Sequence, residues 1–221
     1  MEFFSKDNIA FTIFEYAVSY LELFGVITGI IAVSLSAFAN LWSWPTGIVN
    51  VILAFFLYYQ VQLYPDMFLQ IFFFVTNVLG WWRWANPRKG EEDSKNELRV
   101  SWMTRRQLVF TCSAGLLGTI LMALFARNLH EWLPDLFSKP SASPFLDSFI
   151  MVMSIVTTFY MIQKKIECWI IWLLVDIMAT YVYYIRDIKF FSLLYLIYCV
   201  IAAFAVWNWI REFKSYSKVA A

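Results

Sequence analysis

Charged residues are scarce in this chain of 221 residues: only 15% are Asp, Glu, Lys or Arg, whereas 61% are hydrophobic and 20% aromatic. A soluble domain of this length could not bury so much apolar surface, so we expect lipid to cover part of it. The formal net charge of +1 provides no basic surface for nucleic acid. The composition therefore predicts an integral membrane protein with no nucleic-acid partner.

Residues that carry catalysis or bind metals are also scarce. The one histidine is His130, and Cys112, Cys168 and Cys199 show no metal-ligand spacing. We interpret the cysteines as buried small hydrophobic residues and His130 as an interfacial residue. The sequence holds no nucleophile triad, Gly-rich phosphate loop or nucleotide fingerprint, so we expect no enzymatic activity, cofactor or metal site. It also has no cleavable secretory signal, so we expect no removed leader.

Apolar stretches long enough for transmembrane helices dominate what is present. They cover about residues 21–39, 45–62, 66–84, 107–127, 147–163, 167–185 and 190–211, the fifth being the shortest. Residues 1–20 mix charged and aromatic side chains and predict an amphipathic segment on the membrane surface. A charged loop at 85–106, a polar connection at 128–146 and a tail at 212–221 complete the chain.

A repeat with an offset of 125 residues relates the first three stretches to the last three. Trp44 aligns with Trp169, Trp84 with Trp209, and Glu22 with Asp147. Three helices end on the opposite side of the membrane from where they began, so one further helix must carry the chain back before a parallel repeat can start. We therefore predict an all-α polytopic membrane protein of seven helices in a 3+1+3 arrangement. Its parallel repeats lie at 21–84 and 147–211, around a connecting helix at 107–127.

The distribution of Lys and Arg predicts the orientation. If the loop at 85–106 is cytoplasmic, the outer side holds only Lys6, Arg127, Lys139, Arg186 and Lys189 of the seventeen basic residues. Cytoplasmic loops carry the excess of basic residues. We expect the N-terminus outside, the 128–146 connection in the periplasm and the C-terminus in the cytoplasm.

Asp176 is the only formal charge well inside an apolar stretch. A carboxylate there is costly unless it faces a cavity or a partner, so it marks a functional site by default. Trp169 and Trp172 precede it by seven and four residues and share its helical face. An acid beside indole faces suits a cationic aromatic ligand. The alternatives are a hydrogen-bonded structural Asp and interfacial tryptophans.

Amide side chains mark the first half of the chain. Asn50 lies at about the same depth as Asn77, and Gln70 lies two helical turns before Asn77. Buried amides need hydrogen-bond partners, which could be neighbouring helices or a ligand. The repeat places Asn77 on Ala202 and Asp176 on Val51, so the polar groups break the symmetry, as a ligand with two unlike ends requires. Tyr198 is a further candidate lining residue, although aromatic packing also explains it.

The chain resembles the PnuC family of bacterial vitamin transporters, whose members import nicotinamide riboside. The resemblance rests on the segments Gly47–Val51, Gln60–Tyr64, Leu69–Gln70, Phe72–Phe74, Asn77, Gly80–Trp81, Phe145–Ser154 and Glu167–Trp172. The family pattern carries Asn where this chain has Cys168, and members carry Asn in place of Asp176. Related transporters of thiamin or riboflavin share the fold.

The resemblance implies a fold like that of the SWEET sugar transporters, a homotrimer in the bacterial inner membrane, and import of nicotinamide riboside by facilitated diffusion. Alternating access would proceed by rocking of the two three-helix units around a midplane site, and a separate cytoplasmic kinase would trap the product. Substrate-binding candidates are Asn50, Gln70, Asn77, Trp169, Trp172, Asp176 and Tyr198. The sequence leaves open a carrier of thiamin or riboflavin, a proton-coupled carrier using Asp176, and a receptor that binds without translocating.

Overall fold

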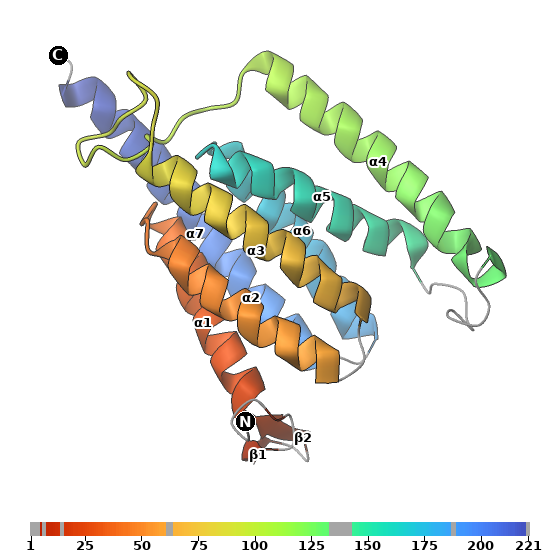
Figure 1. Ribbon diagram of the computed structural model, residues 1–221. Helices are drawn as coiled ribbons and strands as arrows, with labels where there is room; N and C mark the ends of the chain where they lie inside the picture. Colours follow the sequence, from red (N-terminus) through yellow and green to blue (C-terminus); the bar gives the residue numbers. More distant parts are fainter. Residues whose placement is uncertain are drawn as a thin grey trace. The chain divides into compact units, whose positions relative to one another are not determined.

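The protein is helical along almost all of its described length. A computed structural model describes residues 5, 8–13, 16–60, 64–132, 143–186 and 189–219. Within these ranges the chain forms seven helices and one small antiparallel hairpin (Figure 1). The helices are α1 (Tyr20–Ala37), α2 (Ser43–Gln60), α3 (Tyr64–Ala85), α4 (Arg105–Trp132), α5 (Pro144–Ile162), α6 (Glu167–Ile185) and α7 (Lys189–Val219). All seven helices occupy the predicted stretches, although α4 and α7 extend further toward the C-terminus than expected.

The N-terminal segment forms strands in its described part. Strand β1 (Ile9–Ile13) pairs with β2 (Tyr16–Ser19), with Ile9 opposite Ser19 and Ile13 opposite Tyr16. The hairpin leads into α1 through a capping box: Glu22 N donates to Ser19 Oγ at 3.2 Å and Ser19 N donates to Glu22 Oε2 at 2.8 Å. The location of residues 1–20 on the membrane surface stays a prediction.

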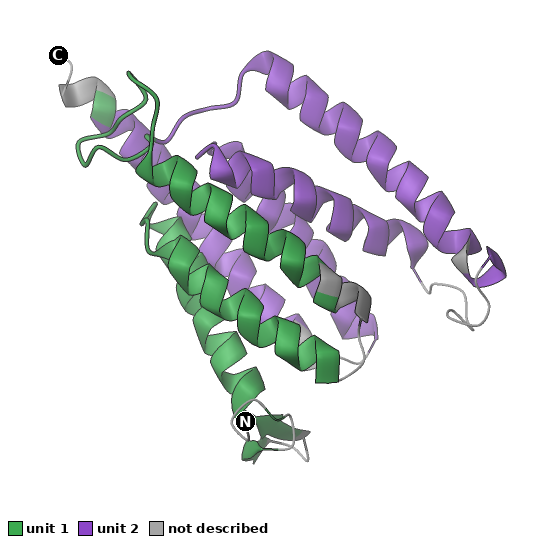
Figure 2. Ribbon diagram, viewed as in Figure 1, with its two compact units in different colours: residues 1–99, 216–221 green, residues 100–215 purple. Residues whose placement is uncertain are grey.

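Two compact units divide the chain (Figure 2). Unit 1 comprises residues 1–99 and 216–221, and unit 2 comprises residues 100–215. In unit 1, α2 contacts both α1 and α3; in unit 2, α5 contacts both α4 and α6. The predicted first repeat at 21–84 therefore falls in unit 1 and the second, at 147–211, in unit 2.

Five helices of the described chain are long and apolar enough to cross a membrane: α1, α4, α5, α6 and residues Ser192–Tyr216 of α7. The other two, α2 and α3, carry the amides Asn50, Gln70 and Asn77. That α2 and α3 also span the membrane stays a prediction.

The two units repeat each other in local structure. Helices α1 and α2 end at Ala37 and Gln60, and α5 and α6 end 125 positions later at Ile162 and Ile185. The buried rings of Trp44 and Trp84 meet edge to face at 5.1 Å and 88°. The corresponding rings of Trp169 and Trp209, also buried, meet edge to face at 5.7 Å and 86°.

The turns between helices repeat as closely. Ala39, after α1, has φ 53°, and Lys164, at the matching position after α5, has φ 55°. Ala39 N donates to Ser36 O at 2.9 Å, as Lys164 N donates to Met161 O at 2.9 Å. A left-handed conformation outside glycine is uncommon, so its recurrence at matching positions is strong evidence of a shared local fold. The two turns at these matching positions therefore have the same local structure.

The charged loop after α3 is ordered by its own polar groups. Arg83 forms an ion pair with Glu91, and the Glu91 carboxylate also accepts a hydrogen bond from Arg88 N. The Arg83 hydrogen bond lowers the pKa of Glu91 below its usual range. Further along, Asp93 Oδ1 accepts from Lys95 N at 2.7 Å and from Glu97 N at 2.9 Å, closing a tight turn.

Candidate functional site

In unit 2, one face of α6 carries the acid and indoles singled out in the sequence. Trp169, Trp172, Asp176, Thr180 and Tyr183 follow one another at spacings of three and four residues, which places them along one side of the helix. Trp169 and Asp176 are buried, while Trp172 is half-buried. Trp172 is thus the indole of this face that keeps surface available for a ligand.

Asp176 is only 5% exposed. Among the described residues, none donates a hydrogen bond to its carboxyl group or forms an ion pair with it. Cys199, on the neighbouring helix α7, is half-buried and lies within electrostatic range of Asp176 and Thr180. Thr180 Oγ1 donates to the backbone oxygen of Asp176 at 2.7 Å, and Ser192 Oγ of α7 donates to Thr180 O at 3.0 Å. The contact between α6 and α7 is therefore polar at this level and contains an unpaired acid.

Trp169 serves the packing of unit 2. It is 2% exposed, and its ring meets Trp209 in the same way as Trp44 meets Trp84 in unit 1. The indole nitrogens of Trp44 and Trp169 are both buried, and neither has a hydrogen-bond partner among the described residues. Because both units contain this arrangement, helix packing accounts for the burial of Trp169.

Tyr198 belongs to an aromatic group on α6 and α7. The rings of Tyr183 and Tyr195 stack at 5.3 Å and 16°, and Tyr198 meets Tyr195 edge to face at 5.9 Å. All three are half-buried. Their packing explains their position, and their partial exposure leaves surface near Cys199 for a ligand.

In unit 1, Asn50 binds a neighbouring helix. Its Nδ2 donates to Gly25 O at 2.6 Å and to Thr28 Oγ1 at 3.3 Å, both on α1. Helix-to-helix hydrogen bonding, one of the two expected roles, thus occupies the NH₂ group. The side-chain carbonyl of Asn50 receives no hydrogen bond from a described residue, so it is the part of this amide that a ligand could use.

Asn77 lies against Gly47. Its Nδ2 donates to Phe73 O, one turn earlier on α3, at 2.8 Å. Its Oδ1 faces α2 so closely that a Cβ on Gly47 would lie 2.3 Å from it. Gly47 is therefore needed for this close approach of α2 and α3. In unit 2, Trp172 on α6 matches Gly47 and Ala202 on α7 matches Asn77. The larger side chain of the pair therefore belongs to the third helix in unit 1 and to the second helix of the repeat in unit 2.

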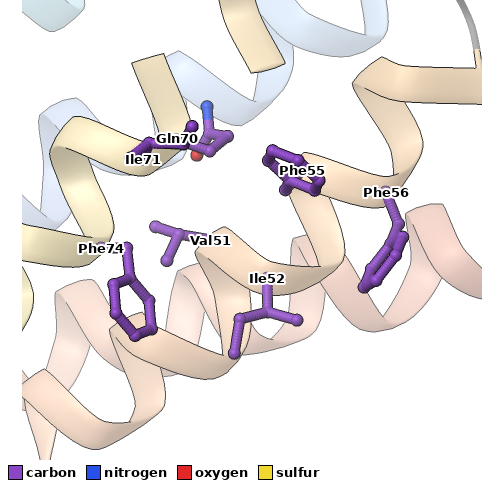
Figure 3. A pocket seen from close by; sticks show the side chains of 7 residues that line it. All are labelled: Val51, Ile52, Phe55, Phe56, Gln70, Ile71 and Phe74. Carbon is purple, nitrogen blue, oxygen red and sulfur yellow. The ribbon is translucent and has the colours of Figure 1, made fainter. Parts of the chain in front are cut away.

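Gln70 lines a groove between α2 and α3 that encloses about 290 Å³. The other lining residues are Val51, Ile52, Phe55, Phe56, Ile71 and Phe74, so Gln70 is the one polar residue of the set (Figure 3). The accessible surface of this groove is entirely apolar, so Gln70 lines it through its side-chain carbons, and the groove can accept a flat apolar ring.

Sequence reasoning missed part of this chemistry. The expected burial holds for Cys168, but Cys112 is exposed on α4 and Cys199 is half-buried beside Asp176. The spacing of Cys199 gives no sign of this contact, which depends on how α6 and α7 pack. His130 lies at the end of α4 with Nδ1 3.0 Å from Arg127 O. Within the described ranges, no group of His, Cys, Asp and Glu residues could hold a metal ion.

Long apolar helices in two similarly built units, with a buried acid and several amides, define a polytopic membrane protein of the transporter class. The chain belongs to the nicotinamide mononucleotide transporter family, whose family model matches residues 19–211. Members of this family are membrane transporters, not enzymes. The resemblance drawn from the sequence is confirmed.

Characterised relatives cover nearly the whole chain. It is 29% identical to the nicotinamide riboside transporter PnuC of Escherichia coli (strain K12), over 96% of this chain and 95% of that protein. It is 25% identical to the riboflavin/roseoflavin transporter RibM of Streptomyces davaonensis, over 92% of this chain and 90% of that protein. A crystal structure of the vitamin B3 transporter PnuC matches 89% of this chain and 83% of its own, with a TM-score of 0.67 and 24% identity. The structural match shows the fold.

Proposed function

We propose that this protein is a carrier of the bacterial inner membrane that imports nicotinamide riboside by facilitated diffusion. The substrate would cross by alternating access, and a separate cytoplasmic kinase would trap it by phosphorylation. The family and the nicotinamide riboside transporters among its relatives support this substrate. The observation that carries the proposal is the carboxyl of Asp176, which is buried, has no side-chain partner among the described residues and lies one helical turn after the half-buried Trp172. The nicotinamide ring of this substrate is a permanent cation, which both groups would attract.

The amides would serve the uncharged part of the substrate. Ribose hydroxyls and a carboxamide both donate and accept hydrogen bonds, as the side chains of Asn50, Gln70 and Asn77 do. Tyr198 would contribute ring contact, and Trp169 would hold Trp172 in place through its packing. The proposal includes the 3+1+3 arrangement with parallel repeats and a homotrimer.

Purified protein separates the candidate substrates. Nicotinamide riboside, riboflavin and thiamin would each be titrated against tryptophan fluorescence, and then offered to liposomes that contain the protein. We expect saturable binding and uptake of nicotinamide riboside alone, driven by its own gradient. Saturable uptake of riboflavin without a response to nicotinamide riboside would show that riboflavin, and not nicotinamide riboside, is the substrate. The similarity to RibM is the reason for testing riboflavin.

The same liposomes test the mode of transport. Facilitated diffusion predicts equal initial rates with and without a pH gradient, and accumulation that stops when inner and outer concentrations match. Accumulation beyond that level only in a pH gradient would show proton coupling, for which Asp176 is the candidate group. Binding without uptake would show a receptor that does not translocate its ligand.

A further inference from the structure

The residues that line the groove of unit 1 have sequence counterparts in unit 2. Adding the repeat offset of 125 to Val51, Phe55, Gln70 and Phe74 gives Asp176, Thr180, Tyr195 and Cys199. The groove residues Ile52 and Ile71 are exposed, as are their counterparts Ile177 and Leu196. The two sets of residues thus occupy matching positions in the repeat, and each set includes two exposed aliphatic side chains.

The chemistry of the two positions differs. In unit 1 these positions carry Val51, Phe55, Gln70 and Phe74, whereas in unit 2 they carry a carboxyl, a hydroxyl, a phenol and a thiol. The carboxyl of Asp176 is nine-tenths or more buried, receives no hydrogen bond from the described chain, and lies beside Cys199. A buried carboxylate is stable only when a positive charge or hydrogen-bond donors compensate it. Within the described residues, the carboxyl of Asp176 has neither kind of compensation.

We infer that Asp176, Thr180 and Cys199 form a cation-binding subsite in unit 2 that selects the transported solute by its charge. This inference rests on the proposed function and deepens it, because it assigns the choice of substrate to one place. Thr180 and Cys199 are new members of the site. A positively charged ring restores the charge balance of Asp176, whereas a neutral ring of the same shape leaves the carboxyl uncompensated. At the equivalent place unit 1 holds Val51 and Phe74, which carry no formal charge.

A matched pair of solutes isolates the charge. Nicotinamide riboside and its 1,4-dihydro form share the ribose and carboxamide but differ in the charge of the ring. We expect wild-type liposomes to favour the cation by about tenfold or more. Asp176→Asn should remove the preference while still transporting the dihydro form. Glu131→Gln, which removes an exposed carboxylate at the end of α4, should keep it.

Equal uptake of both forms by the wild type, or an unchanged preference in Asp176→Asn, would overturn the subsite. Uptake of neither form would overturn the proposed function instead. A second measurement tests the subsite without transport. In a Cys112→Ala, Cys168→Ala background, the remaining Cys199 would react with cationic or anionic methanethiosulfonates, forming a mixed disulfide and releasing methanesulfinate.

The cationic reagent should react with Cys199 roughly tenfold faster than the anionic one, because the neighbouring carboxylate concentrates positive charge. Asp176→Asn should bring the two rates together, and saturating nicotinamide riboside should slow both. Equal rates with Asp176 present would refute the subsite, whatever the transported substrate proves to be.

Discussion

The environment of a few glycines shows how closely α2 and α3 pack. A Cβ on Gly80 would lie 2.3 Å from the ring of Trp44, which is 5% exposed. The matching residue of unit 2 is Ala205, and there the two tryptophan rings lie 5.7 Å apart, against 5.1 Å in unit 1. The two tryptophan rings thus lie closer together in unit 1, where the matching residue is glycine, than in unit 2, where it is alanine.

We predict that Gly80→Ala destabilises the protein by about 1–3 kcal/mol, because a rigid buried ring must shift to admit the methyl group. The thermal unfolding midpoint in detergent, followed by tryptophan fluorescence, measures the change. Gly25→Ala is the control, since nothing lies within 4 Å of a Cβ at that helical position. It should be neutral or slightly stabilising. Equal effects of the two substitutions would contradict the packing argument.

At the scale of elements, the turn between α5 and α6 makes hydrogen bonds that the matching turn between α1 and α2, within the described chain, does not make. In unit 2, Ser101 N donates to Lys164 O at 3.1 Å and Ile166 N donates to Ser101 O at 3.0 Å, so the segment 100–103 pairs with the turn between α5 and α6. Lys165 Nζ donates to Ser101 Oγ at 2.9 Å, and Glu167 accepts from Met103 N at 2.9 Å. In unit 1 the residue matching Lys165 is Asn40, whose Oδ1 accepts from Trp42 N within the turn itself.

We predict that Lys165→Met loosens the segment 100–103 without unfolding α5 or α6. The substitution removes the hydrogen bonds to Ser101 Oγ and Trp102 O. Amide hydrogen exchange at Ser101 and Met103 should quicken roughly five- to tenfold, as a loss of about 1 kcal/mol in local stability implies. Lys95→Met in the charged loop is the matched control and should leave these amides unchanged. Unaltered exchange in Lys165→Met would show that backbone pairing alone holds the segment.

At the scale of the whole molecule, orientation follows from charge. We predict that a reporter active only in the cytoplasm functions when fused after Ala221, and that one active only in the periplasm functions before Met1. The physical reason is the concentration of Lys and Arg in the loop at 85–106 and near the C-terminus. An inverted pattern of activity would place that loop outside and contradict the proposed orientation.

The sequence by itself determined the class of protein, the positions of the seven helices, the offset of the repeat and the family. Composition and the length of apolar segments can be read directly from the sequence. A long apolar segment requires lipid around it, so these quantities alone predict a membrane protein. The offset of 125 residues also relates side-chain contacts. The ring of Trp44 meets that of Trp84 edge to face, and the ring of Trp169 meets that of Trp209 in the same way.

Only the tertiary structure decided what each candidate residue touches. The NH₂ group of Asn50 donates a hydrogen bond to α1, and Asn77 lies against Gly47. Trp169 packs against Trp209, and Cys199 lies near Asp176. These contacts join residues on different helices, and their geometry depends on the rotation and spacing of packed helices. No periodicity along the chain encodes that geometry, so the sequence could predict the acid while the structure was needed to find its neighbours.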